Sequence, residues 1–284
     1  MRYTEVDVFT NRALLGNPVA VVHDADGLSD ETMAAFARWT NLSETTFLLP
    51  PTPAGAAAGA DYRLRIFTPG GELPFAGHPT LGSARAWLDA QTIVEPLPKQ
   101  LIQECGAGLI DVRVESNGSR LAFAAPPLLR SGPVDDATYA QLAAALRISP
   151  TDIQAAQWID NGPGWVGVLL ASADAVLTVR PDFAAMGSLR VGIAGPHAGA
   201  SRPADVEARA FGPSLGVPED PVTGSLGAGL GGWLPGIGVV GETFTIRQGT
   251  VLQRRGLLHI SRDESGQVWV AGDTLPLIIG EVTL

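Results

Sequence analysis

Residues 65–88 read RIFTPGGELPFAGHPTLGSARAWL, and residues 209–234 read RAFGPSLGVPEDPVTGSLGAGLGGWL. Each segment begins Arg-x-Phe-x-Pro, passes a glycine-containing loop and a proline-flanked turn, and closes with a helical pattern that ends in Trp-Leu. The segments differ by a two-residue insertion, and Gly77 aligns with Gly224. Because the same succession of features occurs in both halves, the chain is predicted to contain two related domains.

Strand patterns dominate the rest of the chain. Runs such as TEVDVF, YRLRIF, VEARAF and TFTIRQ alternate apolar and polar residues or are rich in β-branched residues. Helical patterns are confined to about 30–40, 79–89, 135–146 and 222–234. Strands and helices do not alternate as in a doubly wound parallel sheet, so we predict an α+β fold with long antiparallel meanders.

The repeat also sets the expected domain limits. We predict an N-terminal domain at 1–120 and a C-terminal domain at 121–275, with a C-terminal strand at 276–284 that could cross back to the first. The repeat helices are rich in glycine, alanine and serine, although glycine is a poor helix former. Such helices are expected where backbones approach closely, so each is predicted to be enclosed by a curled sheet.

Composition excludes several classes of protein. The 284 residues are 45% hydrophobic, which is enough for a packed core, and the net charge of −10 without any Lys/Arg cluster argues against nucleic-acid binding. The start, MRYTEVDVFT, reads as a strand rather than a signal peptide, and no apolar run is long enough to span a membrane. With a single cysteine, Cys105, the chain is expected to be soluble and cytoplasmic.

Two short motifs resemble known signatures without their context. GAGLGG at 227–232 fits G-x-G-x-x-G, but a dinucleotide site needs a strand directly before it and an acidic residue about 20 positions later, where an arginine stands. GPSLG at 212–216 fits the serine-hydrolase motif, and Ser214, Asp220 and His259 occur in the hydrolase order. Prolines directly after this motif argue against the helix that a nucleophile elbow requires.

Two polar residues stand where the repeat helices begin. His78, followed by a proline, reads either as a capping or packing residue or as a ligand-holding imidazole beside helix N–H groups that bind an anion. Asp220 reads either as a helix cap or as a partner for an amine or hydroxyl of a ligand. The N–H groups of 223–225 and the Ser225 hydroxyl could hold a substrate carboxylate.

Three further residues have open interpretations. Glu44, in NLSETTFLLP, is either a solvated strand end or an acid/base group with apolar neighbours that could take up and return a proton. Asn17 opens a strand from a turn, which ordinary turn chemistry also explains. Cys105 reads as a buried or turn residue, and one thiol provides no metal cluster.

Together these motifs resemble the PhzF-like proteins of phenazine biosynthesis, within the diaminopimelate-epimerase-like superfamily. The resemblance spans nearly the whole chain and rests on DVFTNRALLGNPVAVV, LSETTFLL, RIFTPGGELPFAGHPTLGSA, GVPEDPVTGSLGAGL and RQGTVLQRRGLLHI. It implies two similar domains, each an antiparallel barrel-like sheet around a central helix, with the active site in the cleft between them. It also implies a homodimer.

The resemblance further implies a cofactor-independent isomerase of a small carboxylated metabolite, of the trans-2,3-dihydro-3-hydroxyanthranilate isomerase type and without metal. The catalytic positions of the family fall on Glu44, which would carry the proton between carbons, and on His78 and Asp220, which would hold and polarise the substrate. Substrate-contact positions fall on Asn17, Ser43, Gly77, Gly224 and Ser225.

Other functions stay open at this point. A protein of this fold can bind a metabolite without turning it over, and the serine-hydrolase motif is a further alternative. The two-cysteine racemases of the superfamily are excluded, because the chain has only Cys105. The motifs do not imply a phenazine pathway, and they do not identify the substrate.

Overall fold

The computed structural model describes residues 1–91 and 96–284, which form two compact units. Unit 1 comprises Met1–Ala124 and Ala271–Leu284, and unit 2 comprises Ala125–Val270. The chain therefore leaves unit 1 once and returns to it at its C-terminal strand. In the described ranges, no helix is both long and apolar enough to cross a membrane.

Unit 1 is a sheet that closes on itself. Its strands are β1 (Arg2–Val8), β2 (Asn17–Val22), β3 (Thr45–Leu49), β4 (Tyr62–Thr68), β5 (Gly71–Leu73), β6 (Gln100–Cys105), β7 (Gly108–Glu115), β8 (Arg120–Ala124) and most of β17 (Val268–Glu281); its helices are α1 (Asp30–Thr40), α2 (Pro53–Ala57) and α3 (Gly77–Ala90), with a 3-10 turn at Ser116–Gly118. Pairing runs β1–β2–β3–β4–β6–β7–β8–β17 and returns to β1. The ring of pairings makes this sheet a barrel.

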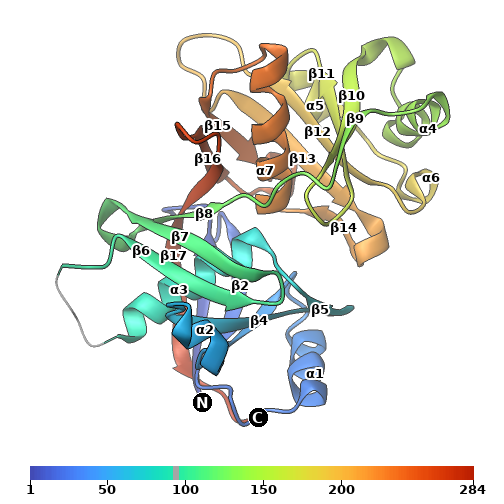
Figure 1. The fold of residues 1–284 in the computed structure, drawn as a ribbon. Helices are drawn as coiled ribbons and strands as arrows, with labels where there is room; N and C mark the ends of the chain where they lie inside the picture. The colour runs from blue at the N-terminus through green and yellow to red at the C-terminus, as the bar shows by residue number, and fades with distance from the viewer. Residues whose placement is uncertain (92–95) are drawn as a thin grey trace. The chain divides into compact units, whose positions relative to one another are not determined.

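Helix α3 fills the inside of that barrel. It contacts β1, β2, β3, β4, β6 and β8, and Figure 1 shows it surrounded by these strands. A Cβ at Gly82 would meet the Val19 side chain at 2.3 Å, so the small residues let strands approach the helix closely. Ser83 shares a 2.8 Å hydrogen bond with Thr46, which satisfies two hydroxyls in a buried place. The predicted enclosed helix is confirmed.

Unit 2 repeats this plan. Its strands are β9 (Arg130–Pro133), β10 (Ile153–Asp160), β11 (Trp165–Leu170), β12 (Arg190–Pro196), β13 (Val206–Gly212), β14 (Val217–Asp220), β15 (Thr243–Gln248) and β16 (Gly256–Arg262); its helices are α4 (Asp136–Leu146), α5 (Ala173–Thr178), α6 (Phe183–Met186) and α7 (Gly224–Trp233), with 3-10 turns at Pro150–Asp152, Pro213–Leu215, Pro235–Ile237 and Thr250–Leu252. The parallel pairs β11–β12 and β13–β15 correspond to β2–β3 and β4–β6 of unit 1. Helix α7 contacts β10, β11 and β16.

The Arg-x-Phe motif holds the same hairpin in each unit. In β4, Arg65 lies over the Phe67 ring and pairs with Glu72 of β5 at 2.7 Å. In β13, Arg209 lies over the Phe211 ring and donates two hydrogen bonds, of 2.8 and 2.9 Å, to the Glu219 carboxylate of β14. A bidentate arginine–carboxylate pair fixes geometry well. The sequence repeat is therefore also a structural one.

The two lookalike motifs lack the required context in the structure. GAGLGG lies inside α7, so no strand and turn precede it as a dinucleotide site would require. Ser214 lies in the 3-10 turn Pro213–Leu215, which continues into strand β14 rather than into a helix. The hydrolase interpretation is therefore wrong, because a nucleophile elbow joins a strand to a helix.

Candidate functional site

Glu44 and His78 lie side by side in unit 1. Glu44 directly precedes β3, and His78 is the second residue of α3. Glu44 Oε2 lies 3.1 Å from His78 Nδ1, and the two side chains are 17% and 4% exposed. This is an ion-pair contact rather than an aligned hydrogen bond, since Glu44 Oε2 has no hydrogen-bond partner within the described residues. The 3.1 Å separation is within reach of proton transfer between the two side chains. Catalytic hydrogen bonds often align only once substrate binds.

The other ring nitrogen of His78 determines where its protons lie. His78 Nε2 is 3.3 Å from the carbonyl oxygen of Pro18, and a carbonyl only accepts, so Nε2 carries a hydrogen. A neutral His78 therefore presents a lone pair at Nδ1 to Glu44. The 3.1 Å contact between Nδ1 and Glu44 Oε2 would become attractive with one additional proton, either on the carboxyl group or on the imidazole.

Asn17 and Ser43 flank this pair along the chain. Asn17 is 1% exposed and opens β2, directly before the proline whose carbonyl holds His78. Ser43 is half-buried beside Glu44 in sequence, and its side chain makes no hydrogen bond to the part of the chain that the structure describes. Asn17 thus lies one residue before the carbonyl that binds His78, whereas the Ser43 hydroxyl is left for another group.

Helix α3 begins without a side-chain cap. Ala76, at the N-cap position, has an extended backbone and no side-chain oxygen to offer the first N–H groups. A Cβ at Gly77 would meet the Phe123 ring at 2.4 Å, so only glycine lets the helix start this close to β8. An uncapped helix start carries partial positive charge and favours a nearby anion.

In unit 2, Asp220 is fastened to the start of α7. Thr223, at the N-cap position, donates from its hydroxyl to Asp220 Oδ2 at 2.5 Å. Gln248 Nε2 donates to Thr223 Oγ1 at 2.9 Å and to the Asp220 carbonyl at 3.0 Å, while its Oε1 accepts from the Thr223 N–H at 3.1 Å. Gln248 is 1% exposed. These bonds hold the Asp220 carboxylate in one position.

Ser225 is oriented by two neighbours. Trp165 Nε1 donates to Ser225 Oγ at 2.9 Å, and Asn161 Nδ2 donates to the Ser225 carbonyl at 2.8 Å. Because Ser225 Oγ accepts the indole N–H, its own hydroxyl hydrogen can donate elsewhere. No side chain caps α7, so its first N–H groups and this hydroxyl form a start suited to an anion.

The predicted site residues thus gather at two helix starts. Asn17, Ser43, Glu44, Gly77 and His78 lie at α3, and Asp220, Gly224 and Ser225 lie at α7. Their catalytic and binding roles stay predictions. Sequence reasoning missed Gln248, Trp165 and Asn161. Gln248 had a signal: in TFTIRQ it follows the buried residues Phe244 and Ile246 at period two, so a polar side chain lies on the inward face.

Neither a metal site nor a reactive thiol accompanies these groups. Within residues 1–91 and 96–284, no three His, Cys, Asp or Glu side chains gather in a way that could hold a metal ion. Cys105 ends β6 and lies in neither helix-start motif. Burial raises the pKa of the Cys105 thiol, which leaves less of the reactive thiolate.

Known proteins share both the sequence and the fold. A family model described as phenazine biosynthesis-like protein matches residues 6–280. Trans-2,3-dihydro-3-hydroxyanthranilate isomerase of Pseudomonas chlororaphis is 36% identical and aligns over 99% of both chains. Antisense-enhancing sequence 1 of Schizosaccharomyces pombe is 37% identical over 98% of this chain and 97% of that protein. A PhzF family crystal structure from Enterococcus faecalis matches with a TM-score of 0.81 and 27% identity, over 100% of this chain and 99% of that one. The predicted fold class and family resemblance are confirmed.

Proposed function

The chain belongs to the phenazine biosynthesis-like family and is an isomerase, and we propose that it catalyses a cofactor-independent proton shift within a small carboxylated metabolite. The proposed chemistry is of the trans-2,3-dihydro-3-hydroxyanthranilate isomerase type, after the Pseudomonas chlororaphis relative. One observation carries the proposal: Glu44 Oε2 lies 3.1 Å from a histidine whose other nitrogen is bound to a backbone carbonyl.

Glu44 is the proton carrier in this proposal. Its carboxylate takes a proton from one substrate carbon, and the electron pair of the broken C–H bond moves into the conjugated system of the substrate. The same proton then goes from Glu44 to a second carbon, so no atom is gained or lost. In this proposal, His78 keeps a proton on Nδ1 throughout, and the positive imidazolium stabilises the Glu44 carboxylate.

The start of α7 holds the substrate in this proposal. Its uncapped N–H groups and the Ser225 hydroxyl bind the substrate carboxylate, because a helix N-terminus favours negative charge. The Asp220 carboxylate, held by Thr223 and Gln248, accepts a hydrogen bond from a substrate amine or hydroxyl. A fixed acceptor costs little reorganisation when substrate binds.

Incubation in D2O tests the proposal. Trans-2,3-dihydro-3-hydroxyanthranilate and a panel of small unsaturated amino and hydroxy acids would be followed by NMR and mass spectrometry. In H2O, at least one compound is expected to be converted to an isomer of equal mass. In D2O, deuterium is expected to enter one carbon of that product if the proton on Glu44 exchanges with solvent. Anthranilate, which has no such tetrahedral carbon, is the matched control compound. Tight binding without conversion or exchange for every compound would instead indicate a metabolite-binding protein.

A further inference from the structure

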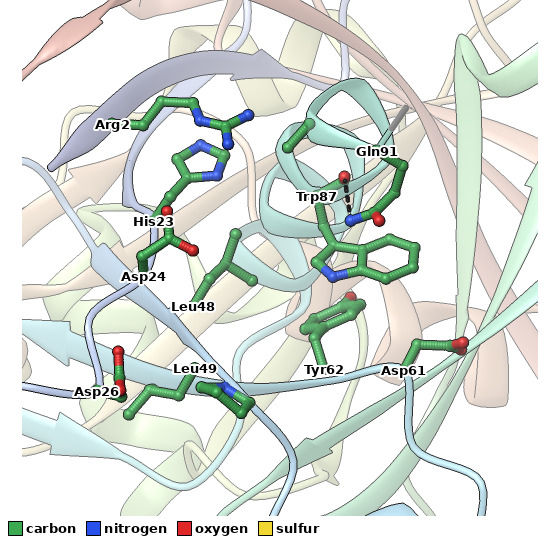
Figure 2. Close-up of a pocket in the computed structure, with 12 residues that line it drawn as sticks. Arg2, His23, Asp24, Asp26, Leu48, Leu49, Asp61, Tyr62, Trp87 and Gln91 are labelled. Carbon is green, nitrogen blue, oxygen red and sulfur yellow. Dashed lines mark hydrogen bonds between the residues drawn. The ribbon is translucent and has the colours of Figure 1, made fainter. Parts of the chain in front are cut away.

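A cavity of about 250 Å³ lies at the end of the unit 1 barrel remote from His78. His78 stands at the start of α3, whereas this cavity is lined by Trp87, Ala90 and Gln91 at the end of the same helix. Figure 2 shows the residues around it, which come from the ends of β1, β2, β3, β4 and α3. The cavity is therefore separate from the residues assigned to the proposed proton shift.

One wall of the cavity is aromatic. The rings of Tyr62 and Trp87 lie against each other with centroids 5.4 Å apart and an interplanar angle of 30°. Leu48 adds an apolar surface opposite them, as Figure 2 shows. Trp87 Nε1 donates no hydrogen bond to the part of the chain that the structure describes. A small ring packed against this pair would bury apolar surface on both sides.

His23 supplies a buried acceptor. Its side chain is 4% exposed, and its Nε2 shares a 2.9 Å hydrogen bond with Thr4 Oγ1. Its other ring nitrogen, Nδ1, has no hydrogen-bond partner among residues 1–91 and 96–284. Burial, and to a smaller extent the nearby Arg2 charge, lowers the pKa of His23 to about 4. The ring is therefore neutral at pH 7, and Nδ1 can accept a hydrogen bond when Nε2 donates to Thr4.

The mouth of the cavity is acidic. Asp24, Asp26 and Asp61 line it, against the single positive charge of Arg2. Asp61 also accepts the N–H of Ile102 at 2.7 Å, so it is fixed in place. Helix α3 points its C-terminal end here and has no basic residue in its last turn, which adds partial negative charge. The summed charge favours a cation over an anion.

From this combination we propose that the cavity binds a small protonated amine that carries a ring. The ring packs against Trp87 and Tyr62, and the ammonium group donates to His23 Nδ1 and to the carboxylates of Asp24 and Asp26. At about 30 Å³ for each water-sized group, the volume holds roughly eight non-hydrogen atoms. Phenethylamine has this size.

Three probes of similar shape test the proposal by isothermal titration and saturation-transfer NMR: phenethylammonium, 2-phenylethanol and phenylacetate. Phenethylammonium is expected to bind at least about tenfold more tightly than either of the others, because only it matches both the aromatic wall and the acidic mouth. Equal binding of the three probes, or tightest binding of phenylacetate, would overturn the proposal. So would the lack of measurable binding by all three.

Variants place the bound probe. Asp24→Asn with Asp26→Asn should weaken phenethylammonium binding by about fivefold or more, since both side chains are exposed and keep their shape. Glu31→Gln, an exposed acidic position in α1 outside the cavity, is the matched control and should leave binding unchanged. Asp220→Asn should also leave it unchanged, and a loss there would show that the amine binds at the start of α7 and would refute the proposal. Trp87→Leu should abolish binding, provided that circular dichroism shows it folded.

Discussion

Helices α3 and α7 occupy equivalent places in the two units, yet their starts are built differently. Both begin with a glycine and lack a side-chain cap. At α3 the polar neighbours are a glutamate and a histidine whose Oε2 and Nδ1 atoms lie 3.1 Å apart. At α7 they are an aspartate and a serine held by hydrogen bonds from Thr223, Gln248 and Trp165. The α3 start places an acid beside an imidazole, and the α7 start is a fixed set of donors and acceptors.

Two buried glutamines sharpen this contrast. Gln103 in β6 and Gln248 in β15 occupy matching strands, and each binds a threonine near the start of the enclosed helix. Gln103 reaches Thr80, inside the first turn of α3, and also accepts from a tyrosine hydroxyl. Gln248 reaches Thr223 and through it the Asp220 carboxylate. The same device supports the core in unit 1 and positions a proposed substrate contact in unit 2.

The largest expected effect separates the two helix starts. Glu44→Gln should lower kcat by about a hundredfold to ten-thousandfold with little change in KM, because it removes the proton carrier and keeps the shape. Asp220→Asn should mainly raise KM, by about tenfold to a hundredfold, because it removes a charged acceptor. Steady-state kinetics on the identified substrate measures both. The contrast fails if Glu44→Gln keeps its turnover or if both variants show the same pattern.

The next test compares the two glutamines. Gln103→Ala and Gln248→Ala should each destabilise the fold by about 1 to 3 kcal/mol, since both leave buried partners unsatisfied. Only Gln248→Ala should also lower kcat/KM, by roughly tenfold, through the freed Asp220 carboxylate. Urea denaturation gives the stability, and rates are normalised to folded protein. Equal kcat/KM values in the two variants would show that Gln248 has only a structural role.

A smaller effect is expected at the tryptophan beside α7. Trp165→Phe removes the N–H that orients Ser225 Oγ, and should raise KM about two- to tenfold with kcat nearly unchanged. Trp269→Phe is the control, because that indole N–H binds Asp263 at 2.8 Å instead. If the two variants raise KM equally, the Ser225 hydroxyl does not contact the substrate.

The smallest expected effect concerns His23, which lines the cavity at the C-terminal end of α3, whereas His78 lies at the start of that helix. The pKa of His23 is lowered to about 4, whereas an unfolded histidine titrates near 6.5. As the pH falls from about 6.5 to 4, the unfolded chain takes up a proton that the folded chain does not, so the stability contribution of His23 decreases. NMR titration of its ring protons should give a midpoint near 4. A midpoint above 6 would show that the ring is solvated rather than buried.

Local sequence patterns predicted the parts that depend on local chemistry. The repeat located both enclosed helices, because close packing needs small residues at regular spacing, as Gly82 against Val19 illustrates. The same repeat placed His78 and Ser225 at corresponding helix starts, with Asp220 a few residues before the second. Glu44 was found as an acidic side chain between a helix and an apolar strand. All four predicted helices, α1, α3, α4 and α7, begin within two residues of the expected positions.

The missed residues act over long sequence separations. Trp165 is 60 residues from Ser225, and Gln248 is 25 residues from Thr223. Apart from the inward-facing position of Gln248, nothing local distinguishes these side chains from ordinary strand residues, because their partners are set by which strands become neighbours. The short helices α5 and α6 were missed for a related reason: four to six residues carry too little periodicity to be told from a loop.

The closed ring of pairings in unit 1 constrains how the protein is made. Strands β1 and β8 find their shared neighbour in β17, which follows unit 2 in the chain. Unit 2 is continuous in sequence and can fold on the ribosome as soon as it emerges, whereas the strands of unit 1 wait with two open edges. Unit 1 is therefore begun before unit 2 and completed after it, and a nascent chain that ends before residue 271 exposes those edges to wrong partners.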